Sequence, residues 1–73
     1  MSGPALANRI RELRQLQPGL TQEELARRCQ VTRQTIIALE AGRYLPSLEL
    51  AFRLARALGA GVEEVFQWAE ENE

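Results

Sequence analysis

The sequence predicts an all-α fold, a compact domain of five short helices. Leu, Ala, Glu, Gln and Arg, which favour helices, dominate the composition, and β-branched residues are few. Hydrophobic residues make up 45% of the 73 residues, which is enough for one small core. The chain has no repeats and no linker long enough to divide it. We therefore expect residues 1–73 to form a single domain.

The first helix is expected to run from Pro4 or Ala5 to Leu16. Its apolar residues follow the i, i+4, i+7 spacing of a buried stripe, which comprises Leu6, Ile10 and Leu13. The Pro-Gly pair at residues 18–19 interrupts the helical pattern, so a loop should follow.

Two further helix starts lie within twelve residues of each other. Thr21 and Glu24 have the Thr-x-x-Glu spacing of a capping box, and Thr32 begins the next helix. That helix closes at Ala41-Gly42, because Gly suits the left-handed position after a helix. Two short helices joined by a tight turn are expected where the second projects from the body of the protein. The DNA major groove, about 12 Å wide, accepts such a helix.

The second half of the chain predicts two more helices. Ser47 caps a helix over residues 48–58, which ends at Gly59. We expect this helix to be central, because its apolar residues cover a wide arc: Leu48, Leu50, Ala51, Phe52, Leu54, Ala55 and Leu58. A fifth helix is expected over residues 62–69, and residues 69–73 form an acidic tail.

Several spaced features of residues 21–40 agree with one another. A Gln opens the first helix, an apolar-Ala pair lies inside it, apolar residues flank the turn, and Glu and Gly follow the second helix: Gln22, Leu25, Ala26, Cys29, Val31, Ile36, Leu39, Glu40 and Gly42. With these features the chain resembles the phage-repressor/Cro-like (XRE) transcriptional regulators, over roughly residues 9 to 67. The resemblance implies a repressor-like domain with a helix-turn-helix at its second and third helices. Gln30 stands where that family usually has Gly, and a positive φ there would cost about 1 kcal/mol.

The resemblance implies which residues read base edges: Arg33, Gln34 and Ala38, with Ile37 beside them. Their chemistry suits the task, since Arg can bond to guanine, Gln to adenine, and an apolar side chain can contact the thymine methyl. The alternative for Arg33 and Gln34 is an ordinary solvated helix face. Ile37 is expected to point outward, because Ile36 and Leu39 face the core.

Phosphate contacts are expected around this helix. Gln22 lies at a helix N-terminus, where free N–H groups favour an anion. The other candidates are Thr35, Arg43 and Tyr44, although Tyr44 could instead pack beneath its loop. The resemblance further implies an ion pair between Arg14 and Glu40 that orients Arg14 towards the DNA backbone. The alternative is a plain surface pair worth about 0–1 kcal/mol.

The net charge of -1 is unevenly distributed. Residues 1–44 hold seven Arg and four Glu, a net charge of +3, while residues 45–73 hold two Arg and six Glu, a net charge of -4. Positive charge therefore accompanies the motif, and non-specific DNA affinity depends on that local charge.

A homodimer is expected, because such domains commonly pair on a two-fold operator with half-sites about 34 Å apart. In a fifth helix, Val62, Val65, Phe66 and Ala69 would share the core stripe while Trp68 lies off it. We expect Trp68, with Phe66, at the dimer interface. The alternative is that Trp68 folds back over the first or fourth helix.

The sequence predicts a cytoplasmic, sequence-specific regulator of double-stranded DNA, a repressor on a pseudo-palindromic operator. No catalysis, metal or cofactor is expected, because the chain has no His and a single cysteine, Cys29, at a buried helix position. No apolar run approaches membrane-spanning length. The alternative is a protein-interaction module, such as an antitoxin that binds a partner protein.

Overall fold

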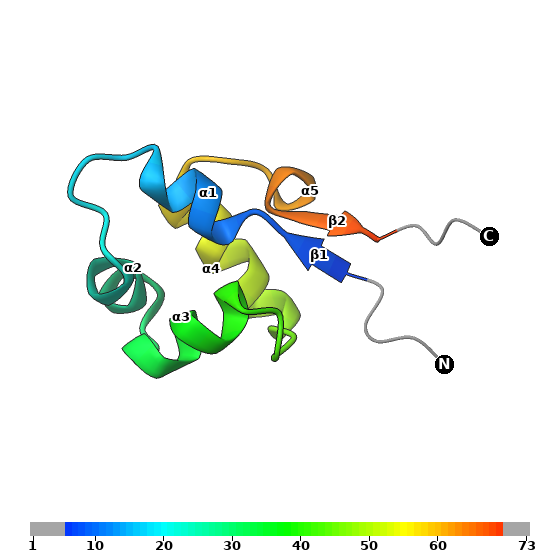
Figure 1. The fold of residues 1–73 in the computed structure, drawn as a ribbon, viewed down its shortest axis with the longest axis horizontal. Coiled ribbons are helices and arrows are strands. Elements are labelled where there is room, and N and C mark those ends of the chain that lie inside the picture. The colour runs from blue at the N-terminus through cyan, green and yellow to red at the C-terminus, as the bar shows by residue number, and fades with distance from the viewer. Residues whose placement is uncertain (1–5, 70–73) are drawn as a thin grey trace.

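The computed structural model describes residues 6–69 and confirms the all-α fold class, with a helix-turn-helix at α2 and α3. This part of the chain contains five helices and a two-stranded sheet (Figure 1): α1 (Ile10–Gln15), α2 (Gln22–Cys29), α3 (Arg33–Glu40), α4 (Leu48–Leu58), α5 (Val62–Val65), β1 (Leu6–Asn8) and β2 (Phe66–Trp68). Figure 1 shows the sheet at one end of the molecule and α2 at the other, with α3 along one side between them. No helix in residues 6–69 is long and apolar enough to cross a membrane.

Side-chain caps begin three of these helices, as the sequence predicts. The hydroxyls of Thr21, Thr32 and Ser47 each accept a hydrogen bond from the backbone N–H three residues later. Each bond satisfies one of the N–H groups that a helix start leaves without an intrahelical partner. Local sequence therefore sets where α2, α3 and α4 begin.

The capping box at Thr21 is only half formed. Glu24 donates its backbone N–H to the Thr21 hydroxyl, but its carboxylate accepts hydrogen bonds from Arg27 (2.5 Å) and Arg28 (3.0 Å). These bonds hold the pKa of the Glu24 carboxyl at about 2, well below its usual range. The Glu24 carboxylate therefore pairs with the two arginines in the last turn of α2 and does not accept the backbone N–H of Thr21, as a complete capping box requires.

The core lies between α4 and the other helices. α4 packs against α1, α2 and α5, and it contributes five buried residues: Leu50, Ala51, Leu54, Ala55 and Leu58. The buried face of α4 is narrower than the apolar arc predicted from the sequence, because Leu48 and Phe52 belong to that arc but are exposed. Cys29 is fully buried in the same core, and burial raises the pKa of its thiol, partly opposed by the Arg53 guanidinium.

The predicted start of the first helix is wrong. α1 begins at Ile10, and residues 6–8 form β1, which pairs antiparallel with β2 from the other end of the chain. Leu6 is 38% exposed and does not belong to a buried helical stripe. The apolar spacing of Leu6, Ile10 and Leu13 was compatible with a helix, but the strand partner lies about sixty residues away and leaves no local signal. Residues 4 and 5 lie outside the described residues.

The fifth helix is shorter than predicted. It ends at Val65, and residues 66–68 continue as β2. Phe66 packs against the core, whereas Ala69 is exposed and does not join a core stripe. Trp68 is 67% exposed, which excludes the alternative that it folds back over a helix. Of the predicted acidic tail, residues 70–73 lie outside the described part of the chain.

The turn between α2 and α3 has the left-handed backbone that its position demands. Gln30 has a φ of 62° and a ψ of 40°, and its backbone N–H continues the bonding of the last helical turn. Its side chain is exposed and makes no hydrogen bond in the described structure. The non-Gly residue therefore carries backbone strain without a side-chain contact to offset it.

We predict that Gln30→Gly raises the free energy of unfolding by about 0.5–1 kcal/mol, because Gly adopts this backbone without steric cost. Urea denaturation measures the change. Gln15→Gly, at a helical and exposed position, is the control and should lower stability. A Gln30→Gly protein that is less stable than the wild type would contradict the strain argument.

Candidate nucleic-acid interface

The two faces of α3 differ sharply in burial. Ile36 and Leu39 are fully buried and hold the helix on the core. Arg33 and Gln34, in its first turn, are exposed, while Ile37 and Ala38 are half-buried. The four residues predicted to read bases therefore lie on the side of α3 that the core leaves uncovered, with the long polar side chains at its N-terminus.

A hydrogen-bonded ion pair fixes the end of α3 against α1 and α2. Arg14 donates to Glu40 at 2.7 Å and 3.5 Å, and also to the Leu20 carbonyl at 3.2 Å. Gln22, the first residue of α2, donates its amide to the same Glu40 carboxylate at 3.0 Å. The Arg14 and Glu40 side chains are 12% and 6% exposed, so this is the predicted interhelix pair and not a plain surface pair.

Two shallow hollows adjoin this ion pair on the α3 side. The first, of about 410 Å³, is lined by residues of α1, α2 and α3 with Ala41: Arg11, Arg14, Gln22, Ile37, Glu40 and Ala41. The second, of about 370 Å³, is lined by Arg14, Thr21, Gln22, Glu23 and Arg33. Because the two hollows share Arg14 and Gln22, they form one continuous surface, which we call the surface in front of α3. The predicted site residues that line it are Arg14, Gln22, Arg33 and Ile37.

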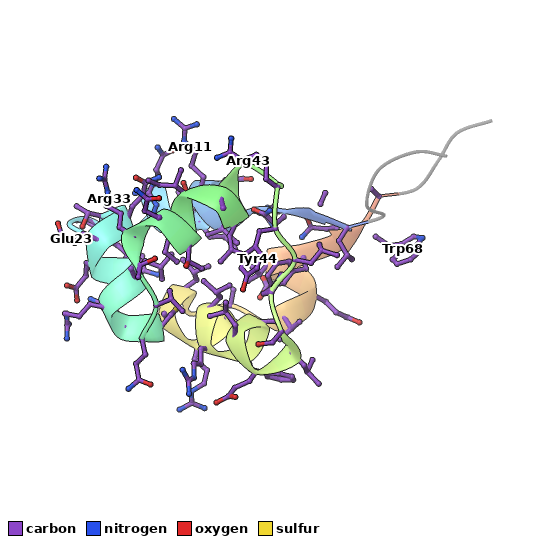
Figure 2. All side chains as sticks on the ribbon, turned by 90° about the horizontal axis from the view of Figure 1, so that it is seen from below. Arg11, Glu23, Arg33, Arg43, Tyr44 and Trp68 are labelled. Atoms are coloured by element: carbon purple, nitrogen blue, oxygen red, sulfur yellow. The ribbon has the colours of Figure 1, made fainter. Side chains whose placement is uncertain are left out.

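Arg11 lines the first hollow, although the sequence analysis did not name it as a candidate. Figure 2 shows it on the same side of the molecule as Arg33 and Arg43, which come from α3 and the loop after it. A usable signal was present, since Arg11 precedes Arg14 by three residues and such residues share a helix face. Three guanidinium groups from separate segments thus face the same direction.

The arginines differ in their ion pairing. Arg9, Arg27, Arg28 and Arg53 pair with glutamates on their own or an adjoining helical turn, and Arg14 pairs with Glu40. Within residues 6–69, the exposed arginines of the α3 side, Arg11, Arg33 and Arg43, take part in no ion pair, and neither does Arg56 on α4. Their positive charge is therefore available to an external anion such as a phosphate.

Thr35 and Tyr44, two other predicted site residues, do not line these hollows. Thr35 is half-buried, and its hydroxyl is within 3.1 Å of the Thr32 hydroxyl. Tyr44 is 46% exposed, and Figure 2 shows it away from the three arginines. Trp68 lies at the opposite end of the molecule from Arg33 (Figure 2), and Phe66 precedes it in β2. The described residues contain no group of His, Cys, Asp or Glu side chains able to hold a metal ion.

The fold and this surface define a helix-turn-helix protein with a cationic face. A family model described as helix-turn-helix matches residues 10–65. An uncharacterized HTH-type transcriptional regulator of Methanothermobacter thermautotrophicus is 67% identical over 58 residues, covering 78% of this chain and 83% of that protein. One of Archaeoglobus fulgidus is 47% identical over 67 residues, covering 92% of this chain and 94% of that protein. The uncharacterized regulator YgzD of Bacillus subtilis is 43% identical over 67 residues, covering 92% of this chain and all of that protein.

The chain belongs to the helix-turn-helix family of Cro/C1-type (XRE) transcriptional regulators. The family is one of DNA-binding regulators and not a class of enzymes. Membership implies that the chain binds double-stranded DNA.

We predict that Glu40→Gln lowers the free energy of unfolding by about 2–3 kcal/mol, because Arg14 would keep a largely buried charge without a carboxylate. Thermal or urea denaturation measures the loss. Glu12→Gln is the matched control, since Glu12 pairs with Arg9 on the exposed surface, where solvent screens the pair, and the substitution should cost far less. An equal loss of unfolding free energy in the two variants would show that the Arg14–Glu40 pair stabilises the fold no more than an exposed pair does.

Proposed function

We propose that the protein is a sequence-specific transcriptional repressor that inserts α3 into the major groove of a pseudo-palindromic operator. The supporting observation is the combination of exposed Arg33 and Gln34 at the start of α3 with two further arginines on the same side, Arg11 and Arg43, which like Arg33 form no ion pair within residues 6–69. A helix about 10–12 Å wide fits the groove, and the arginines would neutralise phosphates on either side of it. Residues 1–73 would act as one domain.

The base-reading roles follow from the chemistry of α3. Arg33 would donate two hydrogen bonds to the N7 and O6 acceptors of guanine, and Gln34 would pair in the same bidentate manner with adenine. Ile37 and Ala38, one turn later, would contact thymine methyl groups. Half-burial suits them to that role, because each presents a limited apolar surface next to the core.

The phosphate contacts would surround α3. Arg11 and Arg43 are exposed and would each hold a phosphate oxygen. Gln22 begins α2, and its side chain is oriented by Glu40, so its remaining N–H groups and the helix N-terminus would face the DNA backbone. Arg14, which lines both hollows, would contribute within this surface, and Thr35 and Tyr44 would contribute outside it.

Selection of bound duplexes from a random DNA pool tests the function. A short inverted repeat, bound with an affinity that falls as salt rises, is the expected result. Selection of no motif would contradict the proposal. It would favour a protein-interaction module, for which the exposed Trp68 would be the natural contact.

We predict that Arg33→Ala weakens binding to the selected duplex by about 10- to 100-fold and relaxes the preference at one base pair of each half-site. Arg11→Ala should instead weaken binding to all sequences and reduce the salt dependence by about one phosphate contact. Arg56→Ala is the control, because Arg56 is exposed on α4 and outside the surface in front of α3. Fluorescence titration at two salt concentrations measures all three; unchanged binding by Arg33→Ala would show that the reading helix is wrongly assigned.

We further propose that the protein pairs with a second copy of itself through the end that carries the sheet. Leu6 and Trp68 lie opposite each other in the sheet and are exposed, and exposed Leu48 lines the same groove as Leu6. Leu45, in the loop before α4, and Phe52, in α4, are also exposed. The groove is apolar and has a volume of about 410 Å³, and its lining includes Leu6, Leu48, Ala51, Val62 and Phe66. A two-fold arrangement would bury both copies of the protruding Trp68 together with both grooves, which is the geometry of an isologous interface.

We predict that Trp68→Ser weakens self-association by about 30-fold or more, because a large aromatic at the centre of an interface is commonly worth 2 kcal/mol or more. Sedimentation analysis across a range of protein concentrations measures the change. Leu16→Ser, which alters another exposed apolar residue outside this end of the molecule, is the control. A wild type that stays monomeric, or an equal effect of Leu16→Ser, would contradict the proposed interface.

A further inference from the structure

One polar side chain connects the sheet to the reading helix. Asn8, the last residue of β1, donates its amide N–H to the backbone carbonyl of Leu39 at 2.9 Å. Its amide oxygen accepts the backbone N–H of Ile10 at 3.1 Å, at the start of α1. Asn8 is half-buried, and its backbone lies opposite Phe66 in the sheet register. A single side chain therefore contacts two helices from within the sheet.

The bond to Leu39 has no substitute. Among residues 6–69, it is the one hydrogen bond between the sheet and α3. The Leu39 carbonyl lies in the last turn of α3 and also accepts the N–H of Gly42 at 3.0 Å. The next residue, Glu40, is held by Arg14 and Gln22, which belong to α1 and α2. The end of α3 is thus fixed to the helical body through Glu40 and to the sheet through Asn8.

This attachment point is distant from the residues that would read DNA. Arg33 lies six residues before Leu39, which corresponds to about 9 Å along a helix. A rotation of about 10° at the Leu39 end would displace the start of α3 by about 1.5 Å, which exceeds the range of about 0.5 Å over which a donor–acceptor distance stays favourable. If the sheet end forms the dimer interface, the angle between α3 and the sheet therefore determines whether Arg33 can reach a base edge.

We propose that Asn8 is a positioning residue that fixes the angle between α3 and the sheet, and thereby the spacing of operator half-sites that the dimer accepts. The inference rests on the proposed dimerisation through the sheet end. In the dimer, each α3 is related to the two-fold axis through its own sheet, so a flexible connection at Asn8 would let the two reading helices fit several spacings. With the amide in place, one spacing is favoured.

Asn8→Asp separates the two hydrogen bonds of the side chain. A carboxylate keeps an acceptor for the Ile10 N–H but cannot donate to the Leu39 carbonyl. Gln17→Glu is a closely matched control, because Gln17 donates its amide to the Leu58 carbonyl, also at 2.9 Å and also at the end of a helix. Both changes replace an amide by a carboxylate and add one negative charge, but Gln17 contacts α4 and not α3.

The measurement is the affinity of each protein for duplexes that carry the selected half-sites at the best spacing and at spacings one or two base pairs shorter or longer. Single half-site affinity and the dimer dissociation constant are measured alongside. We expect the wild type and Gln17→Glu to prefer the best spacing by about tenfold or more, and Asn8→Asp by less than about threefold. Half-site affinity and dimerisation should be equal in the two variants.

The outcomes distinguish this inference from the proposed function. If Asn8→Asp keeps the spacing preference of the wild type, or if Gln17→Glu loses it equally, Asn8 does not position α3. If the wild type binds single half-sites as a monomer, the dimer proposal fails and this inference fails with it. Should Asn8→Asp not unfold cooperatively, Asn8→Ser supplies the same test, because its shorter hydroxyl can accept the Ile10 N–H without reaching Leu39.

Discussion

The rest of the candidate surface depends on the hydrogen bonds that Arg14 and Gln22 donate to the carboxylate of Glu40. It is almost fully withdrawn from water at the end of α3, and side chains of α1 and α2 satisfy it. A buried carboxylate with fewer partners would be costly, so the three helices are constrained to one mutual arrangement. The hollows in front of α3 exist because of that arrangement, since Arg14 and Gln22 line both of them.

Ion pairing leaves positive charge on the α3 side. Glutamates pair with Arg9, Arg27, Arg28 and Arg53 within their own helices or at an adjoining turn. Within residues 6–69, Arg11, Arg33 and Arg43 on the α3 side have no such partner, and neither has Arg56 on α4. A protein of net charge -1 can therefore present a local positive field, and non-specific DNA affinity responds to the local field rather than to the total charge.

Much of the fold and of the site was predictable, because the relevant signals are local. Thr21, Thr32 and Ser47 cap the helices that they were expected to cap, and the left-handed backbone at Gln30 matches the position where the family usually has Gly. The ion pair between Arg14 and Glu40 was expected from the resemblance alone, and it is present. Arg11 could have been found from its spacing of three residues from Arg14, but its position beside Gln22 and Ile37 depends on how α1, α2 and α3 pack. The base and phosphate contacts remain predictions.

By itself, the sequence determined the starts of α2, α3 and α4, the ends of α3 and α4, the family and the uneven distribution of charge. Each of these depends on residues close together in the chain or on a recognisable spacing. Only the tertiary structure decided that residues 6–8 and 66–68 form a sheet, and that Asn8 connects this sheet to α3. Strand pairing across about sixty residues depends on how the intervening helices bring the ends together. The Asn8 side chain likewise bonds two helices only because packing brings them beside it, and no local pattern of residues predicts that.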